Sequence, residues 1–147
     1  MALLAPAEQE KLRESFDEMT APVRLLFFTQ ALECEPCVQT RQILDELPAL
    51  SDRIAIEEVN FVLDKDRAAQ YAVDRVPAIA VLRVSGSGEA EDSRIRFLGT
   101  PSGYEFISLV QAIRLVGGAG STLTDESRRL IAGVEKPVTM QVFTTPT

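Results

Sequence analysis

Histidine and tryptophan are absent from this chain of 147 residues, and cysteine occurs only twice. The lack of histidine excludes Ser-His-Asp and Cys-His catalysis, removes a common zinc ligand and leaves no histidine to act as a pH switch. Two cysteines are too few for the disulfide framework of a small secreted protein, so they point instead to redox or metal chemistry. Any activity must come from the side chains that remain.

Basic charge and long apolar runs are also scarce. Lys and Arg number 15 against 22 Asp and Glu, a net charge of -7, which argues against nucleic acid or an anionic membrane as the main partner. No apolar run approaches the roughly 18 residues that a membrane-spanning helix needs, and the start of the chain lacks the basic stretch of a secretory signal. We therefore expect a cytoplasmic protein that binds neither nucleic acid nor a membrane.

The composition is otherwise that of a globular chain, with 46% apolar and 25% charged residues, and the length suits about one domain. Hydrophobic periodicity and turn residues predict helices that alternate with strands. In chain order we expect a helix at 7–20, a strand at 23–29, a helix that opens at Cys34, a strand at 54–62, a helix at 64–71, strands at 78–84 and 93–99, and a helix behind a capping box at 102–105.

The end of the chain does not fit this unit. A hinge-like stretch at 117–121 precedes a short helix capped by Thr124, and the apolar residues 137–143 predict a terminal strand. We therefore expect a first domain at 1–117, followed at 118–147 by a linker, the short helix and the strand. Because an unpaired apolar strand needs a ladder partner, we expect residues 137–143 to form a homodimer contact or to dock on the chain's own sheet.

The two cysteines, Cys34 and Cys37, form a Cys-x-x-Cys motif at the predicted start of a helix. Two cysteines placed at random in such a chain would have this spacing in roughly 1% of cases. The free N–H groups of a helix start favour a thiolate at Cys34, and Cys37 lies one turn further on, where it can resolve a mixed disulfide. Pro36 stiffens the turn between them. This predicts thiol–disulfide exchange without a bound cofactor, since the sulfur pair itself carries two electrons.

The residues beside the motif limit this interpretation. Glu33 and Glu35 place negative charge next to Cys34, and no basic residue lies within three positions of it. We therefore expect a thiol that is not unusually acidic, and a reductant rather than a strong oxidant. Two other readings stay open at this point: a pair of buried core cysteines, or half of a metal site whose further ligands are missing.

The order of elements resembles the thioredoxin fold, and so do the sequence CEPC at a helix start and the stretch RVPAIAVL at 75–82. The implied fold class is α/β, a mixed central sheet flanked by helices, here with an extra C-terminal helix and strand. In that fold the second stretch is the proline loop. The resemblance therefore implies that Pro77 is cis and that Val76 offers backbone groups to a substrate.

A narrower resemblance rests on FLGTPSGYEF at 97–106 and on EKPVTMQVFTTPT at the end of the chain. Both stretches are similar to the tandem protein disulfide oxidoreductases, or glutaredoxin-like proteins, which carry two thioredoxin folds in series. The similarity covers nearly the whole chain but only the first unit of the pair, and it implies that residues 137–147 begin the second unit. We expect either a truncated chain or a stand-alone N-terminal unit.

The resemblance implies a protein disulfide oxidoreductase that acts on disulfides or dithiols of other proteins. A dithiol donor such as a thioredoxin reductase would supply the electrons, and Pro36, Val76 and Pro77 would shape the substrate groove. The chain departs from thioredoxin at two positions, since Glu33 replaces a tryptophan and Phe28 replaces a buried aspartate. The alternative is a non-catalytic thioredoxin-like module that docks a partner and whose cysteines are vestigial.

Overall fold

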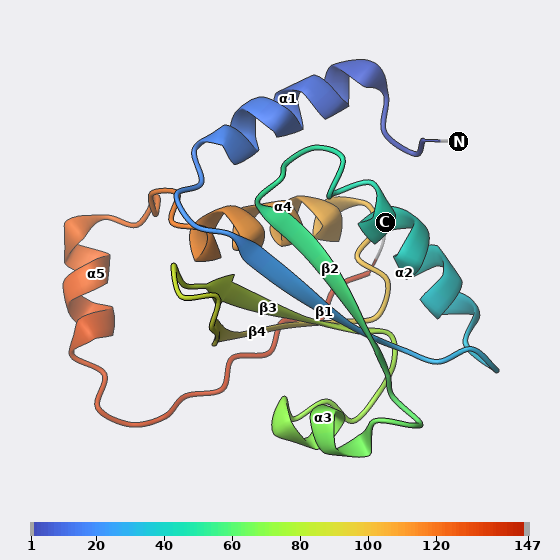
Figure 1. The fold of residues 1–147 in the computed structure, drawn as a ribbon. Coiled ribbons are helices and arrows are strands. Elements are labelled where there is room, and N and C mark those ends of the chain that lie inside the picture. The colour runs from blue at the N-terminus through green and yellow to red at the C-terminus, as the bar shows by residue number, and fades with distance from the viewer. Residues whose placement is uncertain (1, 146–147) are drawn as a thin grey trace.

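The computed structural model describes residues 2–145 and contains a four-stranded mixed sheet with helices against both faces (Figure 1). The elements are α1 (Pro6–Asp17), β1 (Val23–Thr29), α2 (Glu35–Asp45), β2 (Ile54–Asn60), α3 (Lys65–Gln70), β3 (Ala78–Val84), β4 (Ala90–Leu98), α4 (Tyr104–Val116) and α5 (Asp125–Ala132). The strand order is β2-β1-β3-β4, in which only β1 and β2 run parallel. The predicted α/β class, mixed sheet and order of elements are confirmed.

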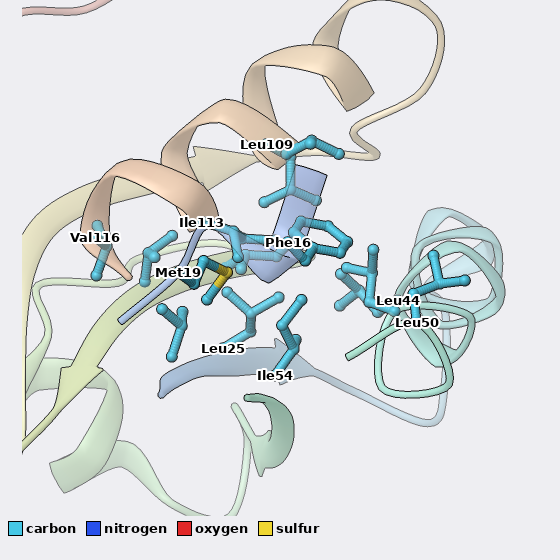
Figure 2. Close-up of a cluster of buried hydrophobic side chains, with 14 of the residues drawn as sticks. Phe16, Met19, Leu25, Leu44, Leu50, Ile54, Leu109, Ile113 and Val116 are labelled. Atoms are coloured by element: carbon cyan, nitrogen blue, oxygen red, sulfur yellow. The ribbon is translucent and has the colours of Figure 1, made fainter. Parts of the chain in front are cut away.

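Both faces of the two central strands, β1 and β3, are buried, which explains why these strands are almost entirely apolar. Alternate side chains of each strand point to opposite faces, so the sheet separates two apolar clusters. The larger cluster joins one face to α1, α2 and α4, and its members include Phe16, Leu25, Leu44, Leu109 and Ile113 (Figure 2). The smaller cluster contains Phe28 and joins the other face to α3.

The first helix is shorter than predicted. It ends at Asp17 rather than at residue 20, and Met19 lies beyond the helix although its side chain is buried in the larger cluster. The N–H of Met19 donates to the carbonyl of Phe16 at 3.0 Å, which closes a turn instead of extending the helix. Within residues 2–145, no helix is both long and apolar enough to cross a bilayer.

Three boundaries differ from the prediction for local reasons. Strand β2 ends at Asn60 because its side-chain oxygen accepts the N–H groups of Val62 and Leu63, both at 3.0 Å, and turns the chain. Strand β4 begins at residue 90 rather than 93, and a bulge with Arg94 at a φ of 66° interrupts its pairing. The predicted capping box at 102–105 is wrong: Gly103 is the N-cap of α4, and no side chain caps this helix.

The C-terminal segment also departs from the prediction. The short helix α5 forms, and the Thr124 hydroxyl accepts the N–H of Ser127 as its cap. Residues 137–143, however, form no strand in this structure and do not dock on the chain's own sheet, so both expectations were wrong for the chain on its own. The reason is that this backbone finds no ladder partner, and its apolar side chains remain exposed. They are Val138, Met140, Val142 and Phe143.

Candidate functional site

The two cysteines lie at the amino end of α2, as the sequence predicts, and they are joined as a disulfide with a Cα–Cα distance of 5.3 Å. Cys34 is the N-cap of the helix and is partly exposed, whereas Cys37 is only 2% exposed. The N–H of Cys37 donates to the Cys34 carbonyl at 3.2 Å. The arrangement does not fit two core cysteines sealed inside the protein, because an attacking group can reach only one of the two residues freely.

Two threonine hydroxyls converge on the carbonyl of Pro36, which directly precedes Cys37 in the turn between the cysteines. The Thr40 hydroxyl lies 2.8 Å from this oxygen and the Thr100 hydroxyl lies 3.2 Å from it, while the two hydroxyls are 3.1 Å apart. Thr40 is completely buried, although Pro36 itself is exposed. These contacts fasten the turn between the cysteines to the β4–α4 loop, 64 residues further along the chain.

The proline loop meets the same β4–α4 loop. The Val76–Pro77 peptide bond is cis, Pro77 is buried and Val76 is half-buried. The Pro77 carbonyl accepts the N–H of Gly99 at 2.9 Å, and the next residue, Thr100, contacts the Pro36 carbonyl. The β4–α4 loop therefore connects the proline loop to the turn between the cysteines and brings all five residues predicted from the sequence to the same end of the sheet.

Sequence reasoning missed the two threonines. Val38, beside Cys37 on α2, is 57% exposed and lies outside the buried face of the helix. The buried face instead carries Cys37, Thr40 and Leu44, which follow the three- and four-residue spacing of one helical stripe. That spacing was the available signal for Thr40. Nothing in the local sequence signals Thr100, because its partner is far away in the chain.

Arg41, the basic residue of α2, forms an ion pair with Glu58 rather than with the glutamates beside Cys34. Arg41 makes a two-pronged contact with Glu58 at 2.5 and 2.6 Å, and this contact raises the pKa of the Arg41 guanidinium. The same guanidinium lies 5.9 Å from the centre of the Phe27 ring. Glu33 and Glu35 are exposed, and within residues 2–145 neither takes part in an ion pair. The charge beside the redox pair is therefore negative, as the sequence predicts.

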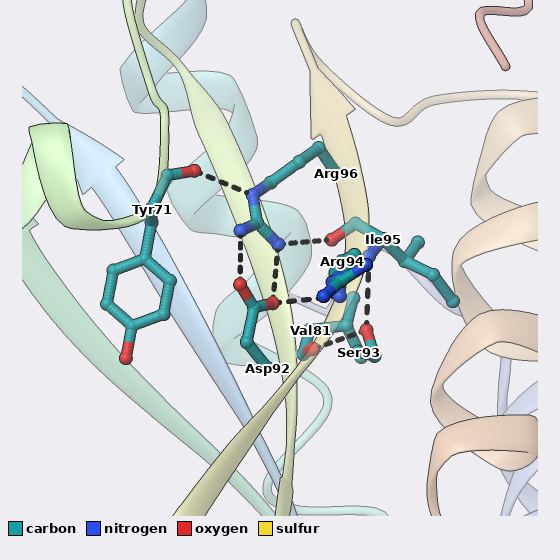
Figure 3. Close-up of polar contacts among 7 residues, drawn as sticks. All are labelled: Tyr71, Val81, Asp92, Ser93, Arg94, Ile95 and Arg96. Atoms are coloured by element: carbon teal, nitrogen blue, oxygen red, sulfur yellow. Dashed lines mark hydrogen bonds and ion pairs between the residues drawn. The ribbon is translucent and has the colours of Figure 1, made fainter. Parts of the chain in front are cut away.

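The connection between α3 and the proline loop is braced by Arg96 on β4 (Figure 3). Its guanidinium donates to both carboxylate oxygens of Asp92 at 2.7 and 2.8 Å and to the Tyr71 carbonyl at 3.1 Å, and it lies 5.7 Å from the centre of the Tyr71 ring. The hydrogen bond from Arg96 lowers the pKa of Asp92. The Tyr71 ring also lies 6.1 Å from the ring of the fully buried Phe28, so the segment between α3 and the proline loop rests on the smaller apolar cluster.

No family model matches the chain. Known proteins are similar to it, however. A probable thioredoxin from Methanothermobacter thermautotrophicus is 28% identical over 78 residues, which span 52% of this chain and 80% of that protein. The solved N-terminal domain (NTD_N/C) of the alkylhydroperoxide reductase AhpF from Enterococcus faecalis is 26% identical with a TM-score of 0.79, and the match covers 90% of this chain and 62% of that one. The chain is a thioredoxin-like thiol–disulfide oxidoreductase unit.

A second solved structure agrees with this fold. A protein disulfide oxidoreductase from Aeropyrum pernix has a TM-score of 0.70 and 24% identity, and the match covers 88% of this chain but only 54% of that chain. The present chain thus spans less than two thirds of both solved chains, while it spans most of the similar thioredoxin. The predicted resemblance to the thioredoxin fold is confirmed.

Proposed function

We propose that this thioredoxin-like unit reduces disulfides in other proteins, with Cys34 as the attacking residue and Cys37 as the resolving residue. The observation that carries the assignment of roles is the unequal exposure of the pair, because Cys34 is partly exposed at the helix start and Cys37 is only 2% exposed. A thiolate at a helix start is favoured by the unpaired N–H groups there. The buried partner is reachable mainly from Cys34 itself.

The proposed reaction consists of two exchange steps. The Cys34 thiolate attacks one sulfur of the substrate disulfide, so that a Cys34–substrate bond forms, the substrate bond breaks and the released thiolate takes up a proton. Cys37 then loses its proton and attacks the Cys34 sulfur, which releases the second substrate thiol and closes the Cys34–Cys37 disulfide. Two electrons pass from the dithiol to the substrate. No other oxidant or reductant takes part in this half of the cycle.

The substrate groove of the proposal is formed by Pro36, Val76 and Pro77. The shared β4–α4 loop supports this assignment, because the Gly99 N–H donates to the Pro77 carbonyl and the Thr100 hydroxyl donates to the carbonyl of the exposed Pro36, beside the redox pair. In the proposal, the half-buried Val76 offers its backbone groups to an extended substrate segment. A dithiol donor resembling thioredoxin reductase would return the protein to the dithiol form, and a cytoplasmic location, where thiols are kept reduced, belongs to the same proposal.

An insulin-reduction assay with dithiothreitol as the electron source tests the proposal. We expect turnover by the unaltered protein, background rates for Cys34→Ser and partial activity for Cys37→Ser, since the excess dithiol can resolve the mixed disulfide in its place. Equal background rates for all three proteins would contradict catalysis. That result would favour the alternative function, a module that docks a partner.

We also propose that residues 118–147 are a linker and the opening of a further structural element, separate from the thioredoxin-like unit at 1–117. The exposed apolar side chains at 137–143 support this, because a strand-like apolar segment without a partner invites association. In the isolated chain we expect a homodimer through this segment. A chain that ends at Gly118 is then expected to be monomeric in sedimentation velocity, and an unchanged oligomeric state would contradict the dimer.

A further inference from the structure

Three large apolar side chains are exposed in the β1–α2 and β2–α3 loops, at the end of the sheet that carries the redox pair. Leu32 is 79% exposed and precedes Cys34 by two residues, while Val62 and Leu63 are 53% and 83% exposed in the loop between β2 and α3. We call these three residues the apolar rim. Single exposed apolar residues are common on protein surfaces, but several beside a reactive group indicate an interaction site.

The backbone explains why the rim lies beside the cysteines. β1 and β2 are parallel neighbours, and their last residues, Thr29 and Asn60, are register partners. The Phe61 N–H donates to the Thr29 carbonyl at 2.8 Å, so the loops that follow β1 and β2 leave the sheet side by side. Figure 1 shows the β1–α2 loop, the β2–α3 loop and the entry to β3 at the same end of the sheet.

The charge beside the rim indicates the kind of segment that fits it. Glu33 and Glu35 flank Cys34, are exposed and form no ion pair within the described part of the chain. The nearby Arg41 is held by Glu58 and does not neutralise them. A substrate that brings basic residues close to its disulfide would be attracted to this surface, whereas an acidic substrate would be repelled.

We infer that the apolar rim, together with Glu33 and Glu35, is the docking surface for a protein substrate segment that carries apolar and basic residues beside its disulfide. The inference rests on the proposed function and adds the substrate's chemistry to it. The apolar side chains of the segment cover the rim, and its basic side chains face the two glutamates. The surface thus selects among disulfides that the redox pair can reduce equally well.

Two matched peptides test the charge part of this inference. Each contains one internal disulfide flanked by the same leucines and reports its reduction by fluorescence, but one carries lysines beside the cysteines and the other carries glutamates. We expect kcat/KM for the basic peptide to exceed that for the acidic peptide by about fivefold to tenfold at low salt. At about 1 M salt the ratio is expected to fall toward one, because the screening length shrinks to about 3 Å.

The variant Glu33→Lys/Glu35→Lys is expected to reverse the preference for the basic peptide. Its control is Glu14→Lys/Asp17→Lys, which changes the net charge equally on the exposed face of α1 and leaves the preference intact. The ratio of the two peptides is the measured quantity, since any change in the reactivity of Cys34 affects both peptides alike. A wild-type ratio near one, or the same ratio in both double variants, would overturn the inference.

The variant Leu63→Ser tests the apolar part. We expect about a threefold to tenfold loss of kcat/KM for both peptides and no change for bis(2-hydroxyethyl) disulfide, which is small, neutral and unable to cover the rim. The control is Leu115→Ser on α4, a leucine that is 50% exposed. An equal loss for all three substrates, or none for the peptides, would count against the rim. If the unaltered protein reduces no disulfide at all, the proposed function fails and the docking surface with it.

Discussion

The Thr40 hydroxyl offers a direct test of how the turn between the cysteines is held. Thr40 is completely buried, and its hydroxyl lies 2.8 Å from the Pro36 carbonyl and 3.1 Å from the Thr100 hydroxyl. Thr40→Val keeps the shape of the side chain and replaces only the hydroxyl by a methyl group. The variant therefore removes the hydrogen bond to the Pro36 carbonyl, together with the contact to the Thr100 hydroxyl, without opening a cavity.

The expected loss in the free energy of unfolding for Thr40→Val follows from these contacts. A buried hydrogen bond between neutral groups contributes about 0.5–1.5 kcal/mol to the free energy of unfolding. The Pro36 carbonyl keeps the Thr100 hydroxyl at 3.2 Å and is not left without a donor, so we expect about 1 kcal/mol for Thr40→Val. In a chain of this size that corresponds to a decrease in Tm of about 2–4 °C.

Urea unfolding of the oxidised protein measures this cost, and Thr100→Val supplies the contrast. Because Thr100 is only partly buried, water can replace its hydroxyl, and we expect a loss below about 0.5 kcal/mol. An unfolding free energy of Thr40→Val that matches the unaltered protein would refute the reasoning. So would a larger loss for Thr100→Val than for Thr40→Val.

Two further predictions concern packing and charge. Gly117→Ala places a Cβ 2.5 Å from the Met19 Cε atom, and we expect it to lower the free energy of unfolding in urea by about 1–3 kcal/mol. The control is Gly120→Ala, whose Cβ would have no atom within 4 Å and should leave the stability unchanged. Equal stabilities of the two variants would contradict the tight packing at Gly117. Because Arg96 lowers the Asp92 pKa below the ordinary 3.8, their contact stabilises the fold fully above that pH and is lost as the pH falls through the lowered value. Arg96→Gln should therefore lose less stability between pH 5 and pH 2 than the unaltered protein, and parallel pH profiles would contradict this.

Local sequence patterns predicted the helices and strands well where the sequence has a continuous apolar run or a residue that fixes the end of an element. The strand at 23–29, the strand at 78–84 and the helix start at Cys34 match the structure, because continuous apolar runs and the proline of the motif leave little choice there. Boundaries failed where a single side chain or backbone conformation decides them. The Asn60 turn and the Gly103 cap are examples, since neither alters the hydrophobic pattern.

In the candidate site, too, features set by neighbouring residues were predictable and contacts between distant residues were not. The spacing of Cys34 and Cys37 and their place at a helix start are local properties, and they were predictable. The hydroxyl of Thr100 reaches the redox turn only because the β4–α4 loop passes beside it, and no local pattern encodes that contact. The terminal strand was predicted from the apolar residues at 137–143, yet it is absent because a strand also needs a partner backbone.

The most direct test of the account is the order in which the reduced cysteines react with a small alkylating reagent. Limiting iodoacetamide is added to the reduced protein at several pH values, and peptide mass spectrometry quantifies the label at each cysteine. Since Cys34 is partly exposed and Cys37 is only 2% exposed, we expect label on Cys34 at least about tenfold faster, rising with pH as its thiolate forms. Equal labelling of both residues, or faster labelling of Cys37, would contradict the assignment of Cys34 as the attacking sulfur.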